Sequence, residues 1–409
     1  MNNIFDYAIL SLFRYGAKNL LITIIFGILV FLMASVIFIT TAIKHEYSEI
    51  IAQMPDILVQ KNYGGKSYFI DESFIDEIYK FPSVKSAFPR LWGQYYFQKE
   101  KIYNEIFTKD KNITLYDRFF VQDDKAYFTI FGVLAYQKNF LKELDRVDFS
   151  GKNANFMLLS DRAMEFFQIY KNAFKFVPFF AKNGELIKLS PHILDHKNSL
   201  LNSDVIVTSE ENARKILGIK DGLFSDICVE VANKKEIELT ADKIRAINSD
   251  LVVITKDEIS KKYEFLYDYK SGFFLMFLMI LVITFVVILY DKLSGTSSEE
   301  RREIGILRAL GWDISHIIKL KIMENLTLSI LAFFIAISLS IFYVFILQAP
   351  LLSDIFIGYK SIKPSFELPF VMDYKILSMI FLLSVPLYVA VSIIPCFKIA
   401  TNNEMDTIK

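Results

Sequence analysis

Four long stretches without a charged side chain constrain this 409-residue chain more than any other feature. They run over 19–43, 271–290, 325–349 and 376–397. A helix needs about 20 apolar residues to cross the hydrocarbon core of a bilayer, so each stretch predicts a transmembrane helix. The first is too long for the apolar part of a signal peptide, and no small-residue cleavage site follows it. We therefore expect it to remain as an anchor.

Lysine and arginine in the short connecting segments predict how these helices are oriented. The loop at 291–324 carries six of these residues and the loop at 350–375 carries three, while the ends at 1–18 and 398–409 carry two each. Short loops rich in positive charge stay in the cytoplasm. Both termini and the 291–324 loop are therefore predicted to be cytoplasmic. The 350–375 loop and the long segment 44–270 are predicted to face outward.

The composition fits membrane helices joined to a large water-soluble domain. The chain is 53% hydrophobic, yet 22% of its residues are charged. Its 46 Lys and Arg residues equal its 46 Asp and Glu residues, so the net charge gives no reason to expect a nucleic-acid partner. Cys228 and Cys396 fall on opposite sides of the predicted membrane. That placement argues against a disulfide framework and against a cysteine-based zinc site.

The outward segment 44–270 is predicted to form an α+β domain. Strand-like and helical patterns alternate near 55–98 and again near 223–256, so each stretch is predicted to form a β-α-β half. The two halves are expected to share one sheet. The insertion between them, near 100–222, is predicted to be mostly β with one helix near 209–219, and to project as a second lobe.

The string YGGKS (63–67) in this domain resembles the end of a phosphate-binding loop. That motif needs a glycine at the position that Gln60 occupies. The segment is also predicted to face outward, away from cytoplasmic ATP. A tight turn at the two glycines is therefore expected.

The string HILDH suggests a weak candidate for a metal site. His192 and His196 would lie one turn apart on a helix, as in inverted zinc-protease motifs, but Asp195 stands where those motifs have Glu. The sequence identifies no further ligand. The alternative is a solvated turn or helix start, so no metal site is assigned.

The cytoplasmic segment 299–318 is predicted to be an amphipathic helix. Its apolar residues recur at helical spacing, and most of its charged residues lie opposite. Gly311 permits a break or the close approach of another backbone. The pattern alone allows a helix that lies on the membrane surface or one whose apolar face docks on a partner protein. The apolar residues are Ile304, Leu307, Leu310, Ile314 and Ile317.

The string RREIGILRALG, followed by HIIKLKIMENL and an apolar run, resembles the signature of the FtsX-like permease family of ABC systems. That family includes the FtsX, MacB and lipoprotein-releasing (Lol) permeases. The tail resembles the family's ending through Pro395, Lys398 and Ala400, although Asn403 and Glu404 stand near the place of its usual Asp-Pro. The residues that match the motif are Arg302, Glu303, Ile304, Gly305, Leu307, Arg308, Ala309, Gly311 and Glu324.

The third predicted span departs from this family, whose members are often glycine-rich there. This chain has LAFFIAISLS instead, with small residues at Ala332, Ala336, Ser338 and Ser340. Small residues let membrane helices approach closely. Looser packing is therefore expected at this span.

The resemblance implies a division of labour between subunits. The four-span part of such permeases has no ATPase motif, and this chain carries no phosphate-binding loop, so a non-catalytic subunit without a cofactor of its own is expected. A separate cytoplasmic ABC ATPase would bind ATP and magnesium, and the helix at 299–318 would dock on it. The residues expected to couple the two are Arg301, Arg302, Glu303, Ile304, Gly305, Leu307, Arg308, Leu310, Gly311 and Glu324.

The resemblance also implies a location and further partners. It places the chain in a bacterial inner membrane, in contact with lipid, beside a second permease that is identical or related, and facing a periplasmic partner protein. The four spans contain no Asp, Glu, Lys, Arg or His, the residues that usually mark a polar route through a membrane. This agrees with what the resemblance to the MacB and Lol permeases implies, which is a machine that transmits force across the membrane.

Three functions remain open at this point. The first is a MacB- or Lol-type permease that exports or extracts a periplasmic or outer-leaflet substrate, which the size and two-lobed layout of 44–270 favour. The second is an FtsX-like regulator that activates a periplasmic cell-wall hydrolase and transports nothing. The third is an anchored binding protein in which 299–318 only lies on the membrane.

Overall fold

The computed structural model describes residues 11, 16–99, 102, 125–133, 155–193, 203–294, 298–357 and 367–401. The chain divides into two units. The helical unit comprises 1–45, 265–357 and 368–409, and the sheet unit comprises 46–264 and 358–367.

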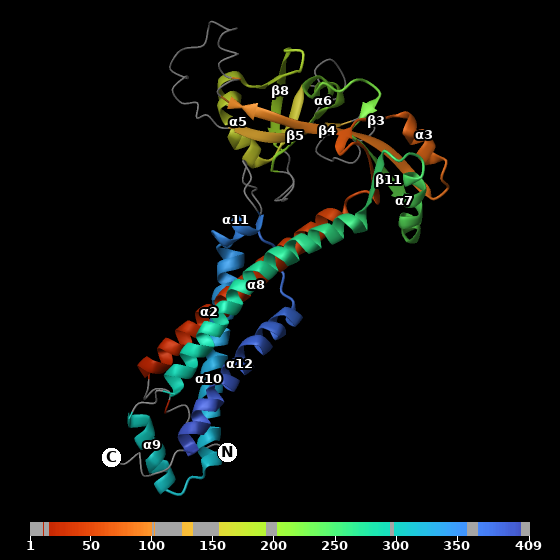
Figure 1. The fold of residues 1–409 in the computed structure, drawn as a ribbon. Helices are drawn as coiled ribbons and strands as arrows, with labels where there is room; N and C mark the ends of the chain where they lie inside the picture. The colour runs from red at the N-terminus through yellow and green to blue at the C-terminus, as the bar shows by residue number, and fades with distance from the viewer. Residues whose placement is uncertain are drawn as a thin grey trace. The chain divides into compact units, whose positions relative to one another are not determined.

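Four long helices dominate the helical unit (Figure 1). They are α2 (Gly16–Ala52), α8 (Lys256–Ser294), α10 (Ile314–Ile341) and α12 (Tyr374–Thr401). Each contains a segment that is long and apolar enough to cross a membrane. The prediction of four transmembrane helices is confirmed, and the chain is a multi-pass membrane protein.

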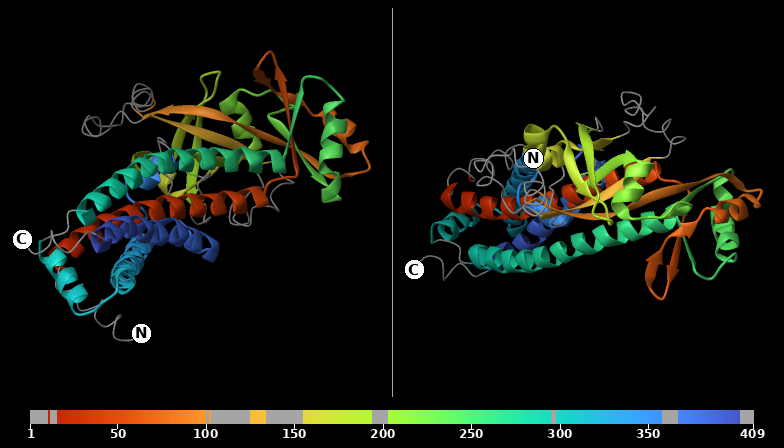
Figure 2. Two further views of the ribbon diagram at one scale, coloured as in Figure 1. Left: turned by 60° about the horizontal axis from the view of Figure 1, so that its bottom comes forward. Right: turned by 90° about the horizontal axis from the view of Figure 1, so that it is seen from above.

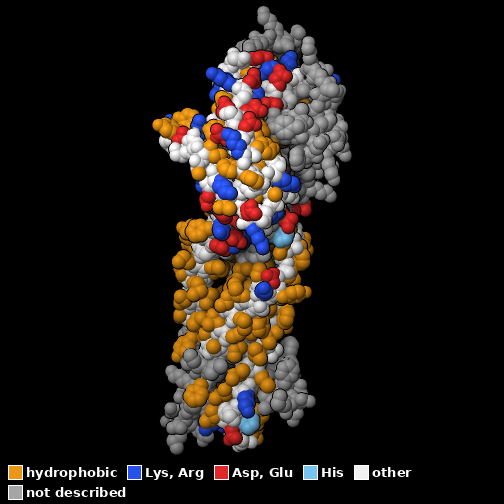
Figure 3. Space-filling view, turned by 90° about the vertical axis from the view of Figure 1, so that its right-hand side faces the viewer, with side chains coloured by type: hydrophobic (Ala, Val, Ile, Leu, Met, Phe, Trp, Pro, Cys, Tyr) orange, Lys and Arg blue, Asp and Glu red, His pale blue; other side chains and the backbone are white. Residues whose placement is uncertain are grey.

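The surface of the helical unit fits this environment. In Figure 3, hydrophobic side chains cover most of the visible face of the long helices, and a few charged side chains lie at the end that carries α9 (Ser298–Ala309). Along α8, Phe273 is 54% exposed, Met276 is 71% exposed and Ile283 is 60% exposed. Water would penalise so much exposed apolar surface, whereas lipid would not.

Shorter elements connect the long helices. The helix α9 precedes α10, a π-helix η5 (Phe342–Ile346) continues α10, and α11 (Leu352–Ile357) follows it. Because α9 ends at Ala309 and α10 begins at Ile314, the predicted single helix over 299–318 is wrong. Its second part is the start of the third long helix, which therefore begins well before the predicted apolar run at 325–349.

The sheet unit contains one ten-stranded sheet among the described residues, in the order β12-β1-β11-β4-β5-β9-β6-β8-β7, with β2 paired to β1. A separate pair joins β3 and β10. The strands are β1 (Ile57–Tyr63), β2 (Lys66–Tyr68), β3 (Ile70–Asp71), β4 (Val84–Gln98), β5 (Lys125–Val133), β6 (Phe156–Leu159), β7 (Val177–Phe180), β8 (Leu186–Ile193), β9 (Val205–Ser209), β10 (Leu223–Phe224), β11 (Asp226–Val231) and β12 (Leu251–Thr255).

The two expected β-α-β halves are present and share this sheet. The first is β1, α3 (Ser73–Tyr79) and β4, and the second is β11, α7 (Ile237–Arg245) and β12, with the short 3-10 helix η4 (Lys234–Glu236) before α7. The strand β1 lies between β11 and β12 and pairs antiparallel with both. Residues far apart in sequence therefore form the centre of one half of the sheet.

The long strand β4 joins this half to the insertion. Its first part pairs with β11 as far as Arg90, and its second part pairs with β5 from Leu91 to Gln98. The strands of the insertion therefore extend the same sheet. Two neighbouring pairs in it, β5 with β9 and β6 with β8, are parallel.

The insertion contains two helices in its described part, where one was predicted. The expected helix is α6 (Glu210–Leu217), and the additional one is α5 (Asp161–Phe174). Ser160 caps α5 by accepting a hydrogen bond from the backbone nitrogen of Ala163 at 3.2 Å. The buried residues Ala163, Phe167 and Tyr170 follow helical spacing. Apolar residues of α3, α5, α6 and α7 join the sheet in one core cluster.

Two glycine positions show why the chain needs this residue. Gly64 and Gly65 have φ values of 57° and 75° in the turn between β1 and β2, so the predicted turn at YGGKS is confirmed. A Cβ at Gly132 would lie 2.9 Å from that of Ala213, so the missing side chain lets α6 approach β5.

Candidate functional site

The segment that carries the predicted coupling residues forms a helical hairpin of α9, a turn at 310–313 and the start of α10. Gly311, with φ of +90°, closes α9. The backbone nitrogen of Trp312 donates to the carbonyl of Leu307 at 3.0 Å, and that of Gly311 donates to Arg308 at 2.9 Å. This pair of bonds is the Schellman motif, which satisfies the last carbonyls of a helix and requires a left-handed residue. The glycine expected to permit a break therefore makes one.

Asp313 starts α10 on the other side of the turn. Its backbone is extended, with φ of −67° and ψ of 153°, as at most helix N-caps. Its carbonyl accepts from the backbone nitrogens of His316 at 2.9 Å and Ile317 at 3.2 Å. An acidic residue here also suits the positive end of the helix dipole. Gly311 and Asp313 together fix where α9 stops and where α10 begins.

The apolar stripe of α9 lies inside the hairpin. Ile304 packs with Ile317, and Leu307 packs with Leu320, while Trp312 contacts both pairs. All four aliphatic residues are at most 8% exposed. The expectation that this stripe offers a free docking face is therefore wrong for Ile304 and Leu307. The stripe is buried because the chain turns at Gly311 and folds α9 back onto α10. Helical periodicity within one segment does not predict that contact.

Other residues of the hairpin remain accessible. Leu310 is 72% exposed and Ile306 is 52% exposed, and Arg302 is exposed as well. Ile306 was not among the predicted coupling residues. An apolar residue on the charged side of an amphipathic helix is the sequence signal that could have identified it. The structure places Arg301 in α9.

Glu324 lies further along α10, just before the apolar part of the helix. It is 7% exposed, and its carboxylate is paired with Lys321 at 2.7 Å. It also accepts a hydrogen bond from the hydroxyl of Ser11. Among the predicted residues, Glu324 is thus separate from the tip of the hairpin and close to its base.

Small residues in the third span pack against other helices. Ala332 is 2% exposed, Ala336 is 1% exposed and Ser340 is fully buried, whereas Ser338 is exposed. The hydroxyl of Ser340 lies 3.0 Å from that of Ser35 in α2. The expectation of loose packing therefore does not hold at Ser340.

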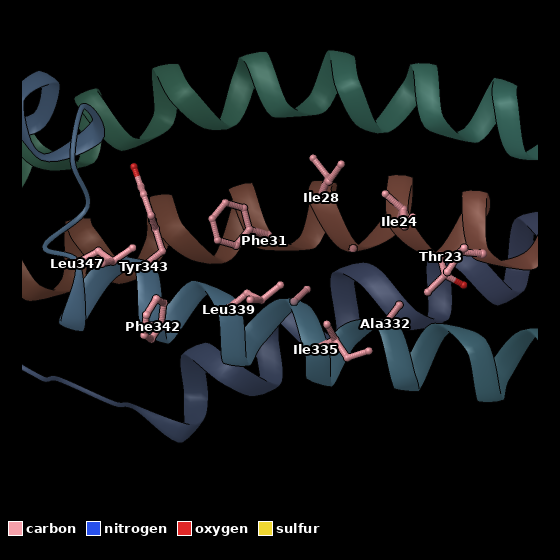
Figure 4. A pocket seen from close by; sticks show the side chains of 13 residues that line it. Thr23, Ile24, Ile28, Phe31, Ala332, Ile335, Leu339, Phe342, Tyr343 and Leu347 are labelled. Carbon is pink, nitrogen blue, oxygen red and sulfur yellow. The ribbon is translucent and has the colours of Figure 1, made fainter.

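A groove opens between α2 and α10 beside this contact. It has a volume of about 500 Å³ and is lined almost entirely by apolar side chains. Figure 4 shows Ile24, Ile28 and Phe31 of α2 along one side and Ile335 and Leu339 of α10 along the other. Packing between these two helices is therefore looser along this groove than at the contact of Ser35 with Ser340.

The histidine pair receives no support as a helical site. His192 lies on the strand β8 and is exposed, so helical spacing does not apply to it. Asp195 and His196 lie outside the described residues. Within the described ranges, no three His, Cys, Asp or Glu side chains come together as a metal site would require.

A family model matches part of the chain, and two solved structures align with it at low identity. The family model described as FtsX-like permease C-terminal matches residues 271–403. No curated protein matches the chain. The periplasmic region of MacB from Actinobacillus actinomycetemcomitans aligns at 11% identity and a TM-score of 0.30, covering 51% of this chain and 92% of that one. The extracellular domain of YknZ, a noncanonic ABC-type transporter from Gram-positive bacteria, aligns at 11% identity and a TM-score of 0.28. The alignment covers 49% of this chain and 99% of that one.

Proposed function

We propose that this chain, whose residues 271–403 match the FtsX-like permease family model, is the membrane subunit of a MacB- or Lol-type ABC transporter. A separate cytoplasmic ATPase binds ATP and magnesium and docks on the α9–α10 hairpin. The permease itself carries out no catalysis. Its sheet unit responds by moving, and that movement exports or extracts a periplasmic or outer-leaflet substrate.

The exposed apolar residues at the tip of the hairpin support this proposal most directly. Leu310 and Ile306 are accessible although the same hairpin buries Ile304 and Leu307. Exposed apolar residues beside charged ones are typical of protein interaction sites. The six Lys and Arg residues of the 291–324 loop favour a cytoplasmic location for this surface, where an ATPase would meet it.

The composition of the spans supports force transmission by the permease rather than passage of a substrate between its spans. The four apolar runs contain no Asp, Glu, Lys, Arg or His, and such residues usually line polar routes across a membrane. The large unit between the first two spans is the part available to act on a substrate. The proposal also includes a second permease, identical or related, both termini in the cytoplasm and a bacterial inner membrane as the location.

The docking surface can be tested with Leu310→Asp and Ile306→Asp. Each variant is co-expressed with a candidate ABC ATPase and purified from membranes, and the bound ATPase is quantified. Both are expected to lose most of it, because a charge enters an apolar contact. Leu239→Asp is the matched control, since Leu239 is 55% exposed on α7 of the sheet unit. Full ATPase binding by both hairpin variants would refute the docking surface.

Leu307→Asp is a less specific variant. Leu307 is 7% exposed between α9 and α10, so this change unfolds the hairpin whether or not a partner binds it.

If the sheet unit instead crosslinked to a cell-wall hydrolase and the chain moved no substrate, the regulatory function would replace transport.

A further inference from the structure

Glu324 is a buried carboxylate at the base of the hairpin. Its side chain is 9% exposed, and the uncharged part of the third span begins at the next residue. Burying a carboxylate is strongly unfavourable unless it is paired and hydrogen-bonded. The partners of Glu324 therefore decide whether this position is tolerated.

Each carboxylate oxygen of Glu324 has a donor of its own. Lys321, one turn earlier on α10, lies 2.7 Å from Oε2. The Ser11 hydroxyl donates to Oε1. The contact with Lys321 is local and needs no other part of the chain, whereas Ser11 is 313 positions away in sequence. Ser11 is itself only 6% exposed.

One turn of α10 therefore has two different neighbours. Leu320 contacts Leu307 of α9, inside the hairpin. Four residues later, Glu324 accepts the hydrogen bond from the Ser11 hydroxyl. Ser11 precedes the first span by a few residues, because α2 begins at Gly16. The hairpin, the head of the third span and the approach to the first span thus meet within one helical turn.

We propose that Glu324 is a positioning residue that fastens the chain before the first span to the head of the third span. A displacement of the hairpin then reaches α2 as well as α10. This role rests on the proposed function for its purpose, but the fastening itself does not depend on a partner. The two parts are tested separately.

The fastening is tested first, in the full-length protein without any ATPase. A Ser11→Cys variant is made in a Cys396→Ser background, and its rate of reaction with a maleimide is measured. The thiol is expected to react slowly, because Ser11 is buried. Rates are compared for the fully ionised thiol, which removes the direct effect of the Glu324 charge on thiol ionisation. Adding Glu324→Ala is then expected to raise the rate about tenfold or more, because the residue at position 11 loses its charged partner on α10. Leu326→Ala is the matched control, because Leu326 is on the same helix and 38% exposed.

An unchanged rate with Glu324→Ala would overturn the fastening. So would an equal increase with Leu326→Ala, because the effect would then reflect general loosening of α10. The native Cys228 is buried and serves as an internal reference that should stay unreactive in every variant.

The coupling role is tested by comparing Ser11→Ala with Ser11→Thr in the presence of the ATPase. Both are expected to bind it as the original chain does, because the hairpin tip is unaltered. Ser11→Ala is expected to lose most of the stimulation of ATP hydrolysis, and Ser11→Thr, which keeps the hydroxyl, to retain it. Equal stimulation by the two variants would overturn the coupling role. If the original chain binds no ATPase, the proposed function fails while the maleimide result stands.

Discussion

Asp226 of β11 binds Arg90 of β4 through two parallel hydrogen bonds, each 2.8 Å long. The two residues face each other in register, at the point where β4 leaves one strand partner for the next. Asp226 is fully buried, and Trp92 donates to it from Nε1 at 2.8 Å. Burial acts to lower the pKa of Arg90, but the bond and charge of Asp226 outweigh it and hold that pKa above its ordinary value.

Asp226→Ala should therefore destabilise the sheet unit by about 3 kcal/mol, because it leaves the partly buried Arg90, whose side chain is 28% exposed, without its counter-charge. Unfolding of the full-length protein in urea can be followed by Trp92 fluorescence in a Trp312→Phe background. Glu211→Ala removes an exposed pair with Lys215 and should cost roughly 0.5 kcal/mol or less. If the two variants lost a similar free energy of unfolding, the stabilising role of the Asp226–Arg90 pair would be contradicted.

Gly311→Val should disturb the hairpin turn. Gly311 has φ of +90°, and nothing lies within 4 Å of a Cβ built there, so the cost is one of backbone conformation. Residues forced into such a conformation pay about 1–3 kcal/mol. In a Trp92→Phe background, the emission of Trp312 should shift to longer wavelength as the packing on Leu307 loosens.

Gly305→Ala is the control within the same motif. Gly305 lies inside α9 with nothing within 4 Å of a built Cβ and no positive φ, so the helix should gain about 1 kcal/mol. The emission of Trp312 should stay the same. A shift in this variant, or none with Gly311→Val, would count against the turn as described.

Cys228 should not react with thiol reagents while the sheet unit is folded. Burial raises the pKa of its thiol to about 12, and the nearby Arg90 only partly opposes this. The unfolded chain loses this proton near its ordinary pKa of 9.0, whereas the folded chain keeps it until about 12. Stability from this group is thus complete below pH 9 and falls as the pH rises toward 12. In a Cys396→Ser background, labelling at pH 8 should require denaturant, and fast labelling of the folded protein would be the contrary result.

Ser340→Leu should weaken the contact between the first and third spans. Ser340 is fully buried, with its hydroxyl 3.0 Å from that of Ser35. Overpacking of this kind costs about 1–3 kcal/mol, and the hydrogen bond itself is worth only about 0.6 kcal/mol in membranes. Thermal unfolding in detergent should show a lower midpoint for Ser340→Leu and a smaller drop for Ser340→Ala. Ser338→Leu, on the exposed side of the same helix, should leave the midpoint unchanged.

Local patterns were sufficient to predict the four spans and the two β-α-β halves. Span length and strand alternation depend on residues close in sequence. The signals for α5 were also local, since Ser160 and the spacing of Ala163, Phe167 and Tyr170 mark a helix. The insertion was interpreted mainly as strands, and this helix was missed.

Contacts between distant residues limited the prediction of the site. Helical spacing shows that Ile304 and Leu307 face something apolar, but it does not say that the neighbours are Ile317 and Leu320 of the same chain. The contact of Ser11 with Glu324 spans 313 positions and leaves no pattern in either segment. For the same reason, Gly311 was identified while the packing around it was not.

The buried residues of α9 and its exposed residues have different consequences for this motif. Ile304, Leu307 and Gly311 specify how the hairpin folds, and they would serve any permease that needs such a hairpin. Under the proposed function, the choice of ATPase would depend on the few outward positions, chiefly the exposed Ile306 and Leu310. Two permeases could thus share the residues that fold the hairpin and still bind different ATPases. If the proposal holds, exchanging these two side chains alone would transfer a permease from one ATPase to another.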